Sequence, residues 1–498
     1  MSTIRKQSII SSLIIYFGFA VGMLNVYFFT KEGLFTVEEY GLTSIFMAVG
    51  GVMMGFASLG MPSYIYKFYP YYKDNLPDRK NDMLAWAFLV TIVGFLLVMV
   101  GGIIFKDLII RKFGEHSPLF VTYYHWVFPV GFGLTIYNLL EVYTWNFHKS
   151  ILTNFLKEVQ WRLLTTLLIA FLITRVIPDF DLFIKLYSFT YPCIALILFL
   201  YLAFTGRLHF SFTFSKVSRR FLKKILQLCA YTYSGLLIFS IAQAFDSIVL
   251  ASLGGLAQAG IFGLAQIMTS VIQAPQRAVV SASIPHLSRA WKEKNRELLQ
   301  RVYRRSSINL LIFSVCLFIL IALNYRQAII TFGLKDSFLL GFNAFILLGI
   351  TRIVDLGSGV NAQIIATSTR WRFELTSGVV LILLMLPLTY IFTVWYGLIG
   401  PAISNLISVS VYNGIRIIFL WRKFKLFPFT KETVYTILLG LGCGVICYFL
   451  LYDMQGFLGL VVRSLVFLLL YGTGVILFKL TPDMQPVLAT VRKRIWKK

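Results

Sequence analysis

Charged and amide side chains within otherwise apolar stretches are the residues of this sequence that could bind a polar ligand. They are Asn25, Asp246, Gln273, Arg277, Arg352 and Asp355. A charged side chain in the middle of a membrane costs about 2.5 to 3.5 kcal/mol on insertion scales, so each one predicts a functional role. The planar guanidinium of Arg352, if it is unpaired, suits the oxygens of a phosphate or pyrophosphate. We therefore expect a polar cavity lined by these side chains.

Several of these residues also have a purely structural interpretation. Arg352 and Asp355 are three positions apart on one face of a helix and could neutralise each other. Asn25 and Gln273 could join neighbouring helices, because amides often form hydrogen bonds across helix contacts in membranes. At this point both interpretations stay open.

Three further charged residues, Glu141, Arg416 and Arg463, lie near the ends of apolar stretches. Long side chains in such positions can extend to the membrane surface. We expect these three to reach the interface and not to line the cavity.

The stretches that carry these residues predict an all-α, polytopic membrane protein. The chain of 498 residues is 58% hydrophobic and only 13% charged, which is too apolar for a soluble surface. Spans need about 20 apolar residues each, and we identify about 14 of them. They are 8–30, 41–62, 83–105, 118–142, 160–178, 182–205, 226–253, 259–281, 306–326, 339–366, 374–395, 398–420, 432–452 and 457–478. A topology of about twelve spans would require weaker stretches to merge or drop out.

The basic residues predict how these spans are oriented. Lys and Arg total 46 against 21 acidic residues, a formal charge of +25. In a soluble chain this surplus could indicate nucleic acid. Here most of the basic residues lie in the termini and in every second loop, which are all on the same side of the membrane. Basic loops stay in the cytoplasm. We therefore expect both termini to be cytoplasmic and no nucleic acid to bind.

Signatures of enzymes and metal sites are missing from the sequence. It has no G-x-x-x-x-G-K-[ST] loop and no G-x-S-x-G motif, and its five histidines are scattered. The five cysteines lie in apolar stretches without a C-x-x-C pair. We expect no cofactor, no metal and no catalytic residue, and hence a carrier and not an enzyme.

A weak internal repeat divides the chain. The segment 39–75 opens with Tyr40-Gly41 and leaves its span through Met61-Pro62, and the segment 259–295 has Ala259-Gly260 and Ile284-Pro285 at corresponding places. An even number of spans separates the copies, so the two halves should lie parallel. The predicted domains are a six-helix lobe at 1–205, a basic cytoplasmic linker at 206–224 and a second six-helix lobe at 225–422. The basic segment 285–305 predicts one amphipathic helix on the inner leaflet.

Short motifs resemble those of the polysaccharide flippases. F-D-x-I-x-L at 245–250, A-G-I-F-G-L-A-Q at 259–266 and I-P-H-L-S-R at 284–289 look like the central segment of these proteins. Asp355-Leu356-Gly357 and the Y-G-L-I-G run at 396–400 are similar as well. The family is the Wzx-like lipid-linked oligosaccharide exporters of the multidrug/oligosaccharidyl-lipid/polysaccharide (MOP) superfamily.

The resemblance implies two parallel six-helix lobes in a V around a central cationic cavity, with two extra C-terminal helices and a basic tail at 423–498. It implies that undecaprenyl-diphosphate-linked oligosaccharide units move from the inner to the outer leaflet by alternating access, for O-antigen of lipopolysaccharide, capsule or exopolysaccharide. Arg277 matches the position of a cavity arginine on the eighth span. The first two spans depart from the pattern, because they offer Asn25 but no intramembrane arginine.

The resemblance also implies a location and partners. The location is the bacterial cytoplasmic (inner) membrane, as a multi-pass plasma-membrane protein. The partners are the lipid-linked glycan, membrane lipids and other membrane proteins of polysaccharide assembly. Coupling to Na⁺ or H⁺ stays open.

Two other functions stay open. A multidrug or cation antiporter of the same fold would need a titratable acid in the cavity, so Asp246 and Asp355 would have to serve. A membrane glycosyltransferase or ligase would be expected to carry polar catalytic residues on a substantial outer loop, whereas the longest outer loop here is only 106–117.

Overall fold

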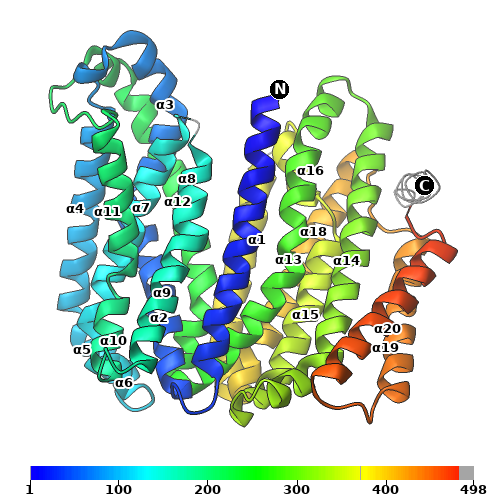
Figure 1. Cartoon of the computed structure of the whole chain (residues 1–498). Helices are drawn as coiled ribbons and strands as arrows, with labels where there is room; N and C mark the ends of the chain where they lie inside the picture. The colour runs from blue at the N-terminus through cyan, green and yellow to red at the C-terminus, as the bar shows by residue number, and fades with distance from the viewer. Residues whose placement is uncertain (1, 148, 371, 482–498) are drawn as a thin grey trace, which may run out of the picture. The chain divides into compact units, whose positions relative to one another are not determined.

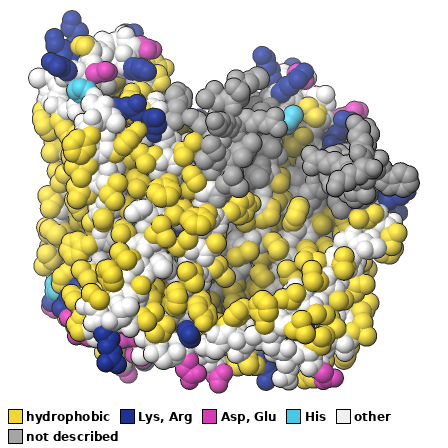
Figure 2. Space-filling model, viewed as in Figure 1, with side chains coloured by type: hydrophobic (Ala, Val, Ile, Leu, Met, Phe, Trp, Pro, Cys, Tyr) yellow, Lys and Arg dark blue, Asp and Glu magenta, His cyan; other side chains and the backbone are white. Residues whose placement is uncertain are grey.

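The computed structural model describes residues 2–147, 149–370 and 372–481, with side chains except at 2–13, 239, 277–278, 281–282, 285 and 288. The described chain is a set of helices (Figure 1), ten of them long and apolar enough to cross a membrane. Figure 2 shows hydrophobic side chains over the middle of α4 (Met83–Ile104) and α11 (Thr190–Phe204) and charged ones near their ends. The predicted all-α membrane protein is confirmed.

Each predicted span overlaps at least one helix, but the predicted count of about 14 stays a prediction. Among the described residues, α17 (Arg372–Tyr396) and α18 (Gly400–Phe424) form one continuous apolar run with the turn η5 (Gly397–Ile399) between them. Of α1, side chains are described only from residue 14, and the apolar part that they cover is Ile14–Thr30, while α9 (Trp161–Ile173) is short. Length and hydropathy alone therefore do not give the number of membrane spans among the described residues.

The chain divides into two compact units, Met1–Gly260 and Ile261–Lys498. In unit 1, α7 packs on α2 and α11, α12 packs on α2 and α3, and α1 packs on α8, η3 and α9. The elements of unit 1 not yet given are α1 (Ser2–Thr30), α2 (Val37–Ala57), α3 (Met61–Asn75), η1 (Asp78–Lys80), α5 (Lys106–Phe113), α6 (Pro118–Thr122), η2 (Tyr124–Trp126), α7 (Val127–Trp145), α8 (Ser150–Phe155), η3 (Leu156–Gln160), α10 (Phe180–Tyr187) and α12 (Lys216–Leu253).

The second unit begins within α13 (Gly255–Lys292). Here α18 packs on α15 and α17, and α14 packs on α15, α19 and α20. Its other elements are α14 (Arg296–Thr331), η4 (Asp336–Gly341), α15 (Phe342–Gly357), α16 (Asn361–Thr367), α19 (Lys431–Leu450) and α20 (Gly456–Leu477). The two last helices coincide with the two C-terminal spans that the sequence predicts.

The division at Gly260 does not coincide with the predicted linker at 206–224. The reason is that α12, which follows this linker, packs on α2 and α3 and so belongs to the first compact unit. The predicted arrangement of two six-helix lobes in a V stays a prediction.

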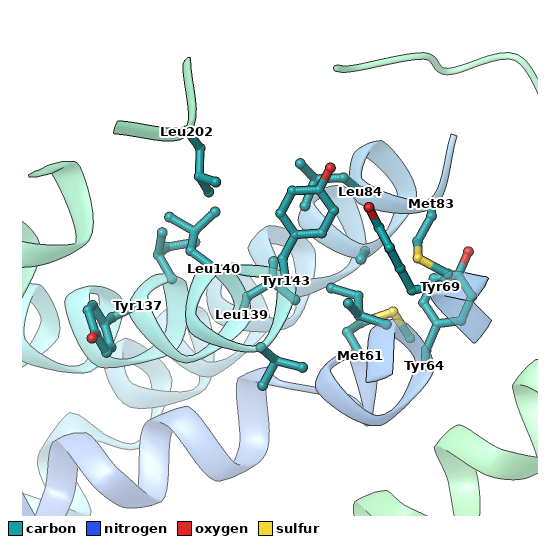
Figure 3. Close-up of a cluster of buried hydrophobic side chains, with 14 of the residues drawn as sticks. Met61, Tyr64, Tyr69, Met83, Leu84, Tyr137, Leu139, Leu140, Tyr143 and Leu202 are labelled. Carbon is teal, nitrogen blue, oxygen red and sulfur yellow. The ribbon is translucent and has the colours of Figure 1, made fainter. Parts of the chain in front are cut away.

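The segment that leaves the second predicted span through Met61-Pro62 is itself a helix, α3. Gly60, with φ of 77°, turns the chain, and Pro62 occupies the first turn of α3. Residues at helical spacing on one face, such as Met61, Tyr64 and Ile65, are buried. They pack against α4, α7 and α11 in the core of unit 1 (Figure 3).

The helical run that contains the start of the fifth predicted span begins earlier than that span. Helix α8, the π-helical segment η3 and α9 follow one another without a break from Ser150 to Ile173, whereas the sequence suggested a start at residue 160. The charged residues Lys157, Glu158 and Arg162 lower the hydropathy of this part, although it packs along α1. A hydropathy window therefore assigns it to the loop.

The prediction of one basic helix at 285–305 is wrong. Helix α13 ends at Lys292 and α14 begins at Arg296, with Lys294 at φ of 52° between them. The Asn295 side chain accepts a hydrogen bond from the Leu298 amide at 2.9 Å and caps α14. The basic residues after Asn295 therefore form the first turns of a membrane-spanning helix.

Close packing of α7 on α11 yields a test of the fold of unit 1. A Cβ at Gly133 would overlap the Pro192 nitrogen and lie 2.6 Å from the Tyr191 carbonyl carbon, whereas a Cβ at Gly101 would meet nothing within 4 Å. We expect Gly133→Ala to destabilise the protein by about 1 to 3 kcal/mol, because two backbones must separate.

The measurement is the thermal unfolding midpoint of the detergent-solubilised protein. Gly101→Ala, the matched control in α4, should leave the midpoint unchanged or raise it slightly, because alanine favours helix. Equal midpoints for Gly133→Ala and wild type would contradict the contact.

Candidate functional site

Unit 1 holds a polar cluster between α1 and α9. The Arg162 Nη1 atom donates to the Glu158 Oε2 atom at 2.8 Å and to the Glu158 carbonyl oxygen at 2.6 Å. Asn25 Nδ2 donates to the Arg162 carbonyl oxygen at 2.8 Å, and Thr166 Oγ1 donates to Asn25 Oδ1 at 2.6 Å. The cluster therefore joins a predicted site residue, Asn25, to a paired arginine on the neighbouring helix.

Local backbone geometry explains how Arg162 reaches this place. Its partner Glu158 lies in η3, a single π-helical segment of the kind that frequently marks functional sites. Helix α1 approaches η3 backbone to backbone, because a Cβ at Gly18 would overlap the Glu158 carbonyl group. One turn further along, a Cβ at Gly22 would lie 3.0 Å from the Arg162 Nε atom. Only small residues on α1 leave room for this guanidinium.

Aromatic rings hold the same guanidinium from other directions. Its central carbon lies 5.6 Å from the Phe19 ring centroid and 5.4 Å from that of Trp161, within the range of a cation–π interaction. The side chains of Arg162 and Glu158 are each 17% exposed. The ion pair is thus held in place and shielded but can still be reached by a ligand.

Glu141 does not extend to the interface, so that expectation is wrong. The residue is 2% exposed, and its carboxylate accepts from Lys157 Nζ at 3.2 Å. Helix α8 and η3 bring Lys157 over α7, where the two charges neutralise each other within unit 1. The partner is the reason that Glu141 can stay buried.

Unit 2 buries Arg416, which also contradicts the expectation of an interfacial side chain. This residue is 3% exposed, its Nε atom donates to Ser377 Oγ at 3.1 Å and its Nη2 atom donates to a carboxylate oxygen of Glu374. The guanidinium carbon lies 3.8 Å from the Tyr412 ring centroid. These contacts join α18 to the first turns of α17.

Arg463 is buried as well, and the same expectation is wrong for it. Its Nη2 atom donates to the carbonyl oxygens of Leu451 and Met454, both at 3.0 Å, and its Nη1 atom donates to that of Leu323 at 3.2 Å. The leftover carbonyls at the end of α19 thereby gain a donor. Arg463 is a structural residue that joins α20 to α14 and to the α19–α20 loop.

A chain of hydrogen-bonded amides starts from Asp355 within unit 2. Asn413 Nδ2 donates to Asp355 Oδ1 at 3.1 Å, and Asn361 Nδ2 donates to Asn413 Oδ1 at 2.8 Å. Both asparagines are buried, while Asp355 and Arg352 on α15 are half-buried. The Asp355 carboxylate therefore has an amide partner on α18, and a ligand role for Arg352 stays a prediction.

The remaining predicted residues are distributed over both units. Asp246 is buried on α12 in unit 1, and Gln273 is half-buried on α13 in unit 2. The side chain of Arg277 lies outside the described residues. The structure brings Asn25 to Arg162 and Asp355 to Asn413, and a cavity shared by all six predicted residues stays a prediction.

Sequence reasoning missed Arg162 as a site residue. The signal was present, because Glu158 and Arg162 are four residues apart and so share one helix face. The predicted span starts at residue 160, so it separates Glu158 from Arg162 and conceals the pair. Only the continuous helix from Ser150 to Ile173 places both charges beside α1.

Comparisons with known proteins yield one family and one fold. The model of a family described as "Polysaccharide biosynthesis protein" matches residues 4–291. No curated protein sequence matches the chain. Among solved structures, a lipid II flippase MurJ in an inward closed conformation has a TM-score of 0.72 at 17% identity, over 94% of this chain and 98% of that chain.

Transporters are similar as well. A multidrug resistance MATE family transporter of the MOP superfamily, in an inward-facing conformation, has a TM-score of 0.61 at 17% identity, over 83% of this chain and 96% of that one. A MOP superfamily transporter from Pyrococcus furiosus has a TM-score of 0.55 at 17% identity, over 84% and 95%. At such identities the likeness to these structures shows the fold alone.

The Arg416–Glu374 pair in unit 2 yields a stability prediction. Arg416 is buried, whereas the Glu374 side chain is 31% exposed. Arg416→Leu removes hydrogen bonds of a charged group, which are worth about 1.5 to 3 kcal/mol each. We expect a clearly lower unfolding midpoint in detergent, and the exposed Arg422→Leu on the same helix serves as the control.

The double variant Arg416→Leu with Glu374→Leu should recover part of the loss, because no unpaired charge remains. An unfolding midpoint for Arg416→Leu as high as that of Arg422→Leu would show that the pair does not stabilise unit 2.

Proposed function

Since the chain belongs to the polysaccharide biosynthesis protein family and has the fold of MOP-superfamily transporters, we propose that it moves a lipid-linked oligosaccharide across the membrane. Family and fold together confirm the resemblance to MOP-superfamily flippases that the sequence motifs carry. The proposed substrate is an undecaprenyl-diphosphate-linked unit of O-antigen, capsule or exopolysaccharide. The proposed direction is from the inner to the outer leaflet.

The Arg162 cluster is the single observation that best supports this substrate class. The first two spans lack an arginine, and Arg162 supplies a cation beside α1 from the neighbouring helix. A guanidinium binds phosphate oxygens through two parallel hydrogen bonds, which a lysine cannot do. Because the carboxylate of Glu158 accepts from the same group, a diphosphate would have to compete with it. Such exchange would permit binding and release.

Arg277, Arg352, Gln273 and the acids Asp246 and Asp355 are proposed to line the same cavity with Asn25. A diphosphate of about two negative charges gains roughly 2.3 kcal/mol per charge per 100 mV on moving outward from an inside-negative cell. The membrane potential therefore favours export even without a coupled ion. Coupling to Na⁺ or H⁺ would add to the free energy that the membrane potential supplies for export.

Alternating access is the proposed mechanism. Each compact unit contains its own buried apolar core, with α3, α4 and α7 in one and α14, α19 and α20 in the other. Units with separate cores can rock as bodies. The proposed location is the bacterial cytoplasmic membrane with both termini inside, where other membrane proteins of polysaccharide assembly would receive the glycan.

The alternative of a multidrug or cation antiporter rests on Asp246 and Asp355. Asp355 already accepts a hydrogen bond from Asn413, so its carboxylate joins α15 to α18 within unit 2. An enzyme is disfavoured because the outer loop 106–117, the longest predicted, is largely the short helix α5 and carries no catalytic motif.

We expect Arg162→Gln to abolish export, because glutamine keeps a hydrogen-bonding group but is shorter and loses the charge that attracts the diphosphate. The measurement is surface glycan together with lipid-linked glycan in the inner leaflet of cells that depend on this chain. Surface glycan should fall at least tenfold while the lipid-linked precursor accumulates, a change worth about 1.4 kcal/mol or more.

Arg175→Gln, at the exposed end of the same helical run, is the matched control and should export normally. Protein amounts in the membrane must be equal in all strains. Normal surface glycan in Arg162→Gln would remove Arg162 from the substrate site.

The same assay tests the arginines that the sequence predicts. Arg277→Ala and Arg352→Ala should each abolish surface glycan while the protein stays inserted, because each removes a proposed phosphate ligand. If both variants produce normal surface glycan, the cavity assignment is wrong.

A further inference from the structure

A basic pocket lies where α14 begins, next to the end of α18. Its volume is about 650 Å³. Helix α14 contributes Arg296, Glu297, Gln300, Arg301, Arg304 and Arg305, and the end of α18 contributes Phe424, Lys425 and Leu426. We call it the α14 pocket. All of its residues belong to unit 2 and none is a residue of the proposed transport cavity.

Positive charge dominates the α14 pocket. Four arginines and Lys425 line it, against a single acid, Glu297. The side chains of Arg296, Arg301, Arg304 and Lys425 are exposed. A cavity with one sign of charge concentrates ions of the opposite sign. The ligand should therefore carry at least one phosphate or a similar anion.

The wall of the pocket is held by backbone and amide contacts. Gln300 Nε2 donates to the Phe427 carbonyl oxygen at 2.6 Å, and the Phe427 amide donates to Gln300 Oε1 at 3.0 Å. Lys425, with φ of 59°, ends α18, and its amide donates to the Trp421 carbonyl oxygen at 3.0 Å. These bonds fix the chain after α18 against the first turns of α14, so the pocket is preformed.

The floor of the pocket is apolar although its rim is cationic. Leu426 is buried, and the half-buried ring of Phe424 lies 4.8 Å from that of Trp291. Exposed aromatic residues, Trp421 and Phe427, follow beside it, with their ring centroids 6.5 Å apart. Exposed tryptophan near the end of a span is typical of the membrane interface. The pocket thus combines basic and apolar residues, the combination expected at headgroup depth.

We propose that the α14 pocket binds the headgroup phosphate of an anionic phospholipid of the cytoplasmic leaflet. Basic pockets on the cytoplasmic side of spans bind such headgroups, with about 1 kcal/mol gained per basic residue near the surface. A free phosphate would not contact the apolar and aromatic residues of the pocket, whereas the acyl chains of a lipid would cover them. This inference goes beyond the proposed function and does not depend on it.

Lipid retention by the purified full-length protein tests the proposal. The protein in detergent micelles is titrated with phosphatidylglycerol or with phosphatidylcholine, and bound lipid is counted by native mass spectrometry. We expect Arg301→Gln with Arg304→Gln to weaken phosphatidylglycerol binding about thirtyfold. Both residues are exposed, so the unfolding midpoint without lipid should not change.

Arg111→Gln with Lys112→Gln, which removes the same charge from the exposed surface of α5 in unit 1, is the matched control and should bind phosphatidylglycerol like wild type. Phosphatidylcholine should bind weakly to all three proteins. Equal phosphatidylglycerol binding by the pocket variant and wild type would overturn the proposal.

Two further results would overturn it in favour of another ligand. If millimolar inorganic phosphate displaced phosphatidylglycerol from wild type, the pocket would be a site for free phosphate. If undecaprenyl diphosphate bound more tightly than phosphatidylglycerol and only the pocket variant lost it, the pocket would load the transport substrate. Export of glycan by the pocket variant is measured separately, so failure of this inference and failure of the proposed function are distinguishable.

Discussion

A charge within hydrocarbon must find a partner inside the protein, and the polar contacts of both units follow from this constraint. Arg162 is paired with Glu158 in unit 1, and Arg416 is paired with Glu374 in unit 2. The hydrophobic effect does not drive helices together within lipid, so close packing and hydrogen bonds determine which helices are in contact. The glycines of α1 show the coupling, because Gly18 and Gly22 admit the backbone of η3 and the guanidinium of Arg162 together.

Hydropathy was sufficient to predict the helical class and the place of most helices, because an apolar stretch of about 20 residues is typical of a transmembrane helix. It failed where charged residues lie inside a helix, as at Lys157, Glu158 and Arg162. Each charge is neutralised by a partner that hydropathy does not take into account: Lys157 pairs with Glu141, and Arg162 pairs with Glu158. Hydropathy also failed for α3, where Tyr64, Tyr69 and Tyr72 are buried by tertiary contacts. Arg416 looked like an interfacial side chain for the same reason, because Glu374 lies on another helix.

The candidate site was predicted only in part. Asn25 was recognised from its depth in an apolar stretch, but its neighbour Arg162 became a candidate only when the continuous helix from Ser150 was known. Asp355 was expected to pair with Arg352 or to bind ligand, and the structure supplies Asn413 as its hydrogen-bond donor. The α14 pocket depends on the break at Lys294 and on the end of α18, which no periodicity in the sequence brings together.

Transport of a lipid diphosphate is the central claim, and reconstitution tests it most directly. The purified protein is placed in liposomes that contain an undecaprenyl-diphosphate-linked glycan, and a membrane-impermeant glycosidase is added outside. The account predicts that the glycosidase reaches the inner-leaflet pool over time in proteoliposomes but not in protein-free liposomes, and that the Arg162→Gln protein behaves like the protein-free control. Access to the outer-leaflet pool alone, identical with and without wild-type protein, would contradict it.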